Sequence, residues 1–199
     1  MKYKFINKPG KHIFKVRKDE EIGVVMVNKG VKMEVVVELV EEGAKALILA
    51  VGIGKDKDMV EILTETNHKA GNTHADTIVH GVMKDESKAE IKGMIRIEKK
   101  TQRVTDFLTE KVLLLSDRAA AIAEPSLEIE TNEVRASHAA TVAPIDKEQI
   151  LYLQTRGLSK KQAEKLIVDG FLKSVIERIK DAKIRKQVEK EIFLLTRQP

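Results

Sequence analysis

Short runs of β-branched and aliphatic residues, separated by turn-forming pieces, make up the chain from its start to Pro144. The stretch from Ala89 to Glu98 shows the pattern best: Ala89, Ile91, Gly93, Ile95 and Ile97 alternate with mostly charged residues. A period of two places successive side chains on opposite faces of a β-strand. No run before Pro144 keeps a helical period, so this part is predicted to be an all-β body of many short strands.

Three architectures give such a pattern: a sandwich, a barrel and a parallel β-helix. Aromatic residues make up only 4% of the chain and Trp is absent, so the core must be built from Val, Ile, Leu, Ala and Met. Stacked coils with inward-facing aliphatic ladders suit that composition, which favours the parallel β-helix. No fixed repeat length is visible, so periodicity alone leaves the choice among the three open.

The periodicity changes after Pro144, where apolar residues adopt helical spacing. Asp146 with Gln149, and Ser159 with Gln162, have the spacing of capping boxes, and Gly157 is placed to end the first helix. A last amphipathic stripe consists of Ile184, Val188, Ile192 and Leu195. The chain is therefore predicted to divide into a β core, residues 1–144, and a helical segment, residues 145–199.

The chain contains no Cys, which excludes a disulfide framework, a thiolate nucleophile and a cysteine-ligated metal or cluster site within it. The N-terminal residues lack the apolar stretch of a signal peptide, and no apolar run approaches the roughly 20 residues that span a bilayer. We therefore expect a cytoplasmic protein with no membrane partner. The net charge of +5 resides in residues 146–199, where both signs mix without stacking aromatics, so nucleic acid is not an expected partner.

Histidines at positions 68, 74 and 80 are evenly spaced by six residues. On one continuous strand they would share a face, but Ala70-Gly71-Asn72 forms a turn signal between the first two. We interpret them as unrelated surface or turn histidines rather than as a zinc site.

His138 stands out within the run from Val134 to Val142. In a regular strand it would be the one polar group on an apolar face, and Ser137 would point to the opposite face. Ser137 and His138 then cannot act together as nucleophile and base. Because a buried imidazole needs partners for its ring nitrogens, two interpretations stay open: a hydrogen-bonded core or turn histidine, or a residue that ligates metal or moves protons.

An ordered set of sequence blocks runs from His68 to Phe171. The blocks are Asn72-Thr73, Val79 to Asp85, Ala89 to Ile95, Leu113 to Ala119, Glu124 to Ile129, Ser137 to Val142, Ile145-Asp146, Leu151 to Ser159, Ala163 and Gly170-Phe171. Together they resemble the SufB/SufD family of the SUF iron–sulphur cluster assembly system, while residues 1–67 resemble it only in being strand-like. Ala139 makes the resemblance SufD-like, because SufB-type members carry a glutamate there.

The resemblance implies a right-handed parallel β-helix followed by a small C-terminal α-helical segment, in a short form without the family's N-terminal helical region. It implies a non-catalytic scaffold subunit, SufD-like, that pairs with a SufB-like or identical β-helix subunit and docks a SufC-type ABC ATPase. The docking residues that it implies are Leu151, Tyr152, Arg156, Gly157 and Phe171. It also implies that His138 is a shared ligand of iron or of a cluster at the subunit interface.

Because the chain has no thiolate, we expect no tightly bound cofactor in isolation and only a transient iron–sulphur cluster in the complex. Two other functions stay open. A stand-alone β-helix enzyme with His138 as base predicts an open cleft beside His138 that carries carboxylate or hydroxyl partners. A truncated paralogue would only regulate assembly.

Overall fold

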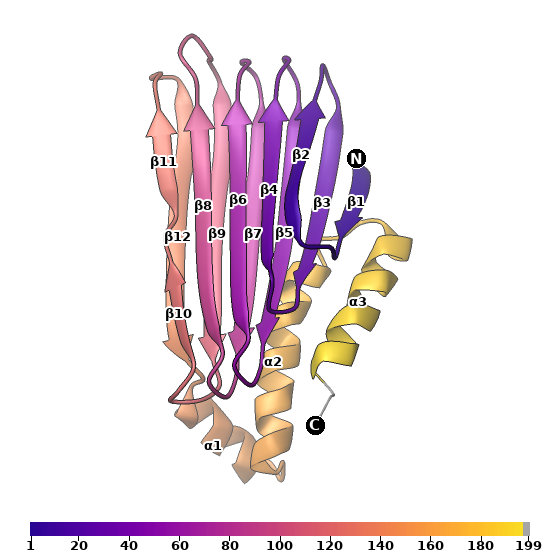
Figure 1. Cartoon of the computed structure of the whole chain (residues 1–199), viewed down its shortest axis with the longest axis vertical. Helices are drawn as coiled ribbons and strands as arrows, with labels where there is room; N and C mark the ends of the chain where they lie inside the picture. The colour runs from indigo at the N-terminus through magenta and orange to yellow at the C-terminus, as the bar shows by residue number, and fades with distance from the viewer. Residues whose placement is uncertain (197–199) are drawn as a thin grey trace.

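The computed structural model describes residues 1–196 and is mainly β: a β-solenoid of about four turns followed by three helices (Figure 1). Its strands are β1 (Lys2–Ile6), β2 (Gly10–Val16), β3 (Glu21–Asn28), β4 (Lys32–Leu39), β5 (Lys45–Gly54), β6 (Met59–His68), β7 (His74–Met83), β8 (Lys88–Ile97), β9 (Val104–Leu114), β10 (Ala120–Ala123), β11 (Ser126–Ile129) and β12 (Val134–Pro144). Of the three architectures that the sequence left open, the structure has the parallel β-helix.

The strands alternate between two parallel sheets as the chain winds. The first sheet has the order β1-β3-β5-β7-β9-β12, and the second has the order β10-β8-β6-β4-β2, with β11 also paired to β8. Neighbours in a sheet therefore belong to successive coils. Figure 1 shows the coils stacked from β1 and β2 on the right to β10, β11 and β12 on the left.

Equivalent positions of successive coils explain why no fixed repeat is visible in the sequence. Glu21 pairs with Lys45, Lys45 with His74, His74 with Thr105, and Thr105 with Arg135. The number of residues between partners changes from coil to coil. The turns between strands absorb this variation while the strands stay in register.

Stacked rows of aliphatic side chains fill the lumen between the two sheets. One row of the first sheet runs through Met26, Ala50 and Val79, all of them without solvent exposure. Such rows bury aliphatic surface in every coil without large rings, which accounts for a stable core in a chain with few aromatics. At the last coils the same row continues with Glu110 and Ala140, so the aliphatic ladder ends there.

The helices are α1 (Lys147–Thr155), α2 (Lys160–Ile176) and α3 (Ala182–Thr196). The capping box predicted at Ser159 and Gln162 is present at the start of α2, and Asp146 caps α1 by accepting from two backbone N–H groups. Gly157 follows the last residues of α1 with a φ of 93°, a conformation that glycine adopts without strain. Within residues 1–196 no helix is long and apolar enough to cross a bilayer.

Helices α2 and α3 cover the outer face of the first sheet. Their apolar residues form one cluster with outward-facing strand residues: Val25, Val27, Leu49, Val51, Ile53, Ile78, Val82, Val168, Leu172, Val175, Ile176, Ile179, Val188 and Ile192. Tyr3 of β1 joins this layer, where its hydroxyl accepts a hydrogen bond from the Lys180 N–H at 3.1 Å. The ring of Tyr3 lies directly over Gly23 of β3, where any Cβ would meet it at 2.4 Å. Because Gly23 has no side chain, Tyr3 fits over it and connects the first strand to the helical segment.

The outer face of the second sheet is charged and faces solvent. Its ion pairs join strands of successive coils: Lys11 with Glu34, Lys32 with Glu61, Lys69 with Glu38, and Arg96 with both Glu65 and Glu128. Such exposed pairs contribute little to stability, because water and salt screen them. Their effect is to keep this face hydrated and to favour the observed strand register.

Candidate functional site at the last coil

Strand β12 is the last strand of the first sheet and has one free edge. It pairs with β9 along its whole length, and no strand within residues 1–196 pairs with its other side (Figure 1). The Ile145 N–H donates to Leu114, and the Glu133 carbonyl accepts from Val104, so odd-numbered positions direct their polar backbone groups toward β9. By strand alternation, the N–H and C=O groups of His138 and Ala140 point to the free edge.

His138 lies on the face of β12 that continues the wall of the lumen. It is paired with Leu108 of β9, and Val134 and Ala136 of the same face pack against the buried cluster that contains Leu108. The predicted sharing of this face is therefore confirmed. His138 is nevertheless exposed, because no further coil within residues 1–196 covers β12. The interpretation as a buried core histidine is wrong, and its partners would have to come from outside this coil.

Glu110, a residue that the sequence analysis did not single out, lies one coil inward from the row end at Ala140. It has no solvent exposure, and neither of its carboxyl oxygens has a hydrogen-bond partner within the described residues. The carboxyl group crosses the lumen to Gly93 of β8, where any Cβ would lie 2.6 Å from Oε1. Burial, with a smaller contribution from Glu124, raises the pKa of Glu110 to about 8.

A signal for Glu110 was present in the sequence. In β9 the buried positions alternate, and Glu110 occupies the same face as Val104, Leu108 and Val112. An acidic residue on an apolar face is costly unless something satisfies it. Asp106 shares that face too, so alternation alone would have marked both carboxyl groups for attention.

One carboxyl oxygen of Asp106, Oδ2, accepts hydrogen bonds in a sealed network at the turn end of the same coils, while Oδ1 has no partner within the described residues. His68 Nε2 lies 2.9 Å and Thr66 Oγ1 2.5 Å from Asp106 Oδ2, and His68 Nδ1 lies 2.7 Å from Thr73 Oγ1. His68 and Asp106 have no solvent exposure, so no substrate reaches this pair. Its arrangement supports a structural role.

The three evenly spaced histidines lie in three different surroundings, and two of them, His68 and His80, are buried rather than at the surface or in a turn as predicted. His68 faces the lumen, His74 is exposed at the start of β7, and His80 points outward to α2. Within residues 1–196 no group of three or more His, Cys, Asp or Glu side chains could hold a metal ion.

The helical positions proposed for partner binding separate into two places. Leu151, Tyr152, Arg156 and Gly157 are exposed on or just after α1, where Leu151 is 63% and Tyr152 58% exposed. The Arg156 guanidinium lies 5.3 Å from the centre of the Tyr152 ring, a cation–π arrangement that holds both side chains on one surface. Beside them a hollow of about 590 Å³ separates α1 from the end of the solenoid, with Ile150 and Leu151 in its wall.

Phe171 lies elsewhere, at the inner side of α2. Its ring stacks on His80 at a centroid distance of 4.2 Å, and its carbonyl oxygen accepts from His80 Nδ1 at 3.0 Å. Burial, followed by the positive charges of Lys111 and Arg178, lowers the pKa of His80 to about 4. Phe171 therefore fixes α2 to the first sheet, while the surface of α1 stays free for a partner.

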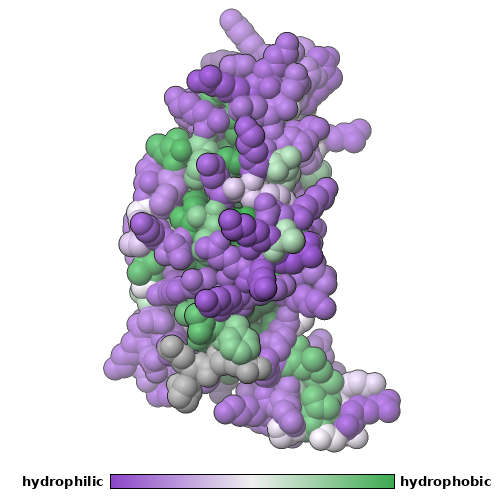
Figure 2. All heavy atoms as spheres, turned by 90° about the vertical axis from the view of Figure 1, so that its right-hand side faces the viewer, coloured by the Kyte–Doolittle hydropathy of each residue, from purple (hydrophilic) through white to green (hydrophobic). Residues whose placement is uncertain are grey.

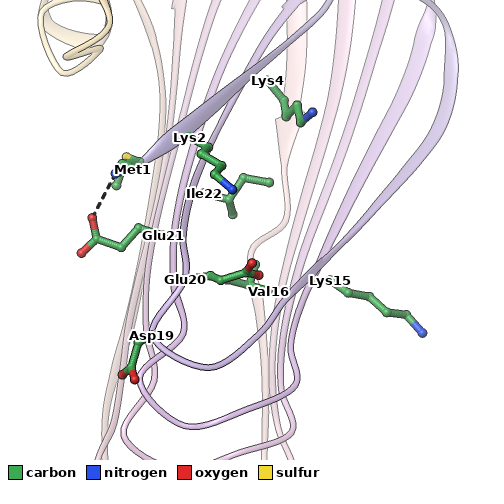
Figure 3. Close-up of a pocket in the computed structure, with 9 residues that line it drawn as sticks. All are labelled: Met1, Lys2, Lys4, Lys15, Val16, Asp19, Glu20, Glu21 and Ile22. Carbon is green, nitrogen blue, oxygen red and sulfur yellow. Dashed lines mark ion pairs between the residues drawn. The ribbon is translucent and has the colours of Figure 1, made fainter.

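A hollow of about 470 Å³ lies at the opposite end of the solenoid (Figure 3). Lys2, Lys4, Asp19 and Glu20 line it, and Glu21 is already paired with the N-terminal ammonium group at 3.5 Å. Figure 2 shows this side of the molecule as mostly hydrophilic, with small hydrophobic patches among the hydrophilic residues. Positive and negative side chains are mixed around this hollow, so it offers a ligand no concentrated charge. The last coil therefore remains the better candidate for a functional site.

Comparison with known proteins agrees with these features. Residues 13–171 match the family model described as "SUF system FeS cluster assembly, SufBD core domain". The chain belongs to the SufB/SufD family. The match begins well before His68, so the strand-like N-terminal coils belong to the same core as the blocks recognised in the sequence.

Several curated members of the family are similar to this chain. The iron–sulphur cluster assembly protein SufD of Bacillus subtilis (strain 168) is 32% identical over 136 residues, which are 68% of this chain and 31% of that protein. SufD of Escherichia coli (strain K12) is 28% identical over 131 residues, 66% of this chain and 31% of that protein. A SufBD family protein of Mycobacterium tuberculosis (strain ATCC 25618 / H37Rv) is 27% identical over 188 residues, 89% of this chain and 47% of that protein. The chain thus spans less than half the length of these relatives.

Proposed function

We propose that this chain is a non-catalytic, SufD-like scaffold subunit of iron–sulphur cluster assembly that pairs through β12 with a second β-helical subunit, either SufB-like or identical. The family membership supports a role in SUF cluster assembly. The observation that supports pairing is the free edge of β12, eleven residues long and mostly exposed. A long unpaired edge strand is a template for another strand, and proteins that do not use such an edge usually cover or charge it.

Side chains around the free edge of β12 also support this surface as the place where a second subunit pairs. Val142 of β12, Phe107 of β9 and Ile129 of β11 are large apolar residues that are 38–41% exposed at this end. Along β12 the only ionisable residues are Arg135 and His138, so the edge lacks the charges that would repel a partner strand. A second subunit would bury this surface together with the free backbone groups.

Pairing is tested by Ala140→Pro. The Ala140 N–H points to the free edge, so proline removes a group that a partner strand would use without breaking the ladder to β9. We expect the variant to lose association with the second subunit in size-exclusion chromatography with light scattering, while its circular dichroism spectrum is unchanged. Ala140→Ser, which keeps the N–H, is the matched control, and equal association of both variants would refute pairing through β12.

The proposal further assigns ATPase docking to α1. Leu151 and Tyr152 present apolar surface there that nothing within residues 1–196 covers, next to the hollow between α1 and the solenoid. Exposed aromatic and aliphatic residues beside a concave surface are the usual anchors of protein interfaces. A SufC-type ABC ATPase of the cytoplasm is the partner that the family membership suggests.

Capture of the cognate SufC-type ATPase on the immobilised full chain tests this assignment. We expect micromolar binding, and a loss of about tenfold or more with Leu151→Ala or Tyr152→Ala, as for central interface residues. Ile13→Ala is the control, because Ile13 is 55% exposed but lies on β2 at the opposite end. No capture of the ATPase by the parent chain would overturn the docking proposal.

His138 has the proposed role of a shared iron or cluster ligand. It is exposed, lies at the free edge and continues the wall of the lumen, so a group bound there is accessible to both subunits. No cysteine is available in the chain, so a transient cluster would take its thiolates from the partner. His138→Ala is expected to lower cluster formation by the complex while the isolated subunit stays folded.

A further inference from the structure

We infer that copies of this chain associate head to tail, with the first coil of one copy (β1 and β2) stacked on the last coil of the next (β10, β11 and β12) (Figure 1). Both sheets would then continue across the interface as they do between coils of one chain. The inference rests on the proposed function, because it uses the β12 edge. It adds a second surface, the first coil, as the one that this edge receives when the two subunits are identical.

Both sheets have a free edge at each end of the solenoid. Within residues 1–196, β1 and β2 are the outermost strands at one end, and β12 with β10 and β11 are outermost at the other. All pairs in the two sheets are parallel. A parallel ladder repeats the same geometry at every step, so the last strand of each sheet can accept the first strand of another copy without a change of direction.

Charge is divided between these two ends. Residues 1–18 contain seven Lys or Arg and no Asp or Glu, whereas residues 120–133 contain four Glu and no Lys or Arg. Unlike ends of two copies therefore attract each other, while contact between two last coils would bring glutamates together. Charge favours the head-to-tail arrangement over the other pairings of identical chains.

Outward-facing rows of the second sheet bring these charges into register. Lys11 starts a row that ends at Glu124. Lys15 starts a row that ends at Glu128. Within these rows, cations and carboxylates of successive coils already pair, as Lys11 does with Glu34 at 2.6 Å. Stacking a second copy adds one further step of the same kind to each row, because a lysine of one copy comes beside a glutamate of the next.

A third row, at the turn that follows β2, has the same polarity and no competing ion pair. Backbone hydrogen bonds from coil to coil continue the register one residue past the strands and place Arg17 and Glu130 in one row. Both side chains are exposed, and neither forms an ion pair within the described residues. Ile13, which is 55% exposed between the two lysine rows, would be covered by the same contact.

The backbone of the last coil limits the strength of the contact. The N–H groups of Glu124 and Glu130 donate inward to β8, so odd-numbered residues direct their backbone groups to the free edge. Pro125 is one of these residues and has no N–H, so the new ladder of the second sheet lacks one hydrogen bond. In the first sheet, β1 is in register with residues 136–140 of β12, which contain no proline. We therefore expect a reversible contact that weakens with salt.

Sedimentation velocity of the full chain over a range of protein concentrations tests the inference. A head-to-tail contact leaves one unused surface at each end, so the mass should grow past the dimer as concentration rises and fall toward the monomer at high salt. Arg17→Glu and Glu130→Lys should each weaken self-association by about fivefold or more, because each turns an attraction into a repulsion.

An equimolar mixture of these two variants should restore growth, because each variant's altered end then meets an opposite charge on the other. Lys99→Glu is the matched control. It makes the same charge change as Arg17→Glu on an exposed residue, but in the turn between β8 and β9, where no stacked copy would lie. Its self-association should equal that of the parent.

The inference is overturned by a parent chain that stays monomeric or stops at a closed dimer. Parent-like association of Arg17→Glu, or a mixture of variants that does not associate, would overturn it equally. Binding of a SufB-like subunit to the parent and to Arg17→Glu is measured in parallel, since it needs β12 but not the first coil. If that binding is present alongside any of these results, the head-to-tail contact alone fails, whereas its absence from the parent counts against the proposed function.

Discussion

Acid should loosen the attachment of α2 to the solenoid through His80. This histidine is 6% exposed, stacks on Phe171 and donates from Nδ1 to the Phe171 carbonyl. Burial lowers its pKa most, and the positive charges of Lys111 of β9 and Arg178 after α2 add to the effect, so its pKa falls from 6.5 to about 4. The folded state therefore holds His80 neutral under conditions in which the unfolded chain already binds a proton.

The sign and size of the effect follow from proton linkage. Between pH 6.5 and 4 the unfolded state binds more protons than the folded state, so stability is complete above pH 6.5 and declines as the pH falls. At 1.36 kcal/mol per pKa unit, the loss from this one group reaches about 2 kcal/mol at pH 5. Half of the full shift would still give a loss of about 1.5 kcal/mol at pH 5, which urea titrations resolve.

His80→Phe isolates this contribution, since phenylalanine keeps an aromatic ring against Phe171 but never ionises. At pH 8 the variant should be less stable than the parent by about 1 kcal/mol, the value of one hydrogen bond. At pH 5 the order should reverse, because only the parent loses stability. The free energy of unfolding from urea curves at pH 8, 7, 6 and 5 provides the measurement.

Phe171→Leu is the matched control for that experiment. It removes the ring stack but leaves His80, its carbonyl partner and the hydroxyl of Ser174 that also donates to that carbonyl. Its stability should be lower at every pH, yet it should keep the decline toward pH 5. Parallel curves for the parent and His80→Phe would refute the reasoning, because His80 would then not be the group that titrates.

Two further predictions concern the core and the helix caps. Asp106→Ala removes the partner of buried His68 and Thr66 and should lower the free energy of unfolding by about 3–5 kcal/mol. Asp76→Ala, which breaks a partly exposed pair with Arg178, should lower it by about 1 kcal/mol. Chemical denaturation distinguishes the two effects. Ser159→Ala removes the cap of α2 and should lower the free energy of unfolding by about 1 kcal/mol. Ser174→Ala in the same helix should change it little, and equal effects of the two variants would contradict the capping argument.

Local patterns predicted the elements that depend on local physics. The alternation from Ala89 to Ile97 predicted a strand with Ala89, Ile91 and Ile95 inside, and β8 has this arrangement. The hydroxyl of Ser159 and the amide of Gln162 predicted the start of α2, because a capping box needs only residues close in sequence. Each of these features depends only on residues that lie close together in the sequence.

The candidate site depends on contacts that no local pattern contains. His138 is exposed because β12 is the last strand of its sheet, and this follows from how many coils precede it, not from the residues beside it. Strand alternation marks Glu110 as an acidic residue on an apolar face, but its place in the lumen row after Met26, Ala50 and Val79 is visible only when successive coils are aligned. Variable turn lengths between coils hide that alignment in the sequence.

The helical segment contacts the first coil, so this solenoid is not a simple linear stack of coils. A stack of coils is a linear array in which each coil touches only its neighbours, and such arrays fray from their ends. Here α1 follows the last coil, while Tyr3 receives the Lys180 N–H and Lys29 is paired with Glu191 of α3 at 2.5 Å. The helical segment thus closes the array into a loop. A force that a partner applies to α1 and α2 would be transmitted to β1 as well as to β12. We therefore expect the strands at both ends of the solenoid to open together.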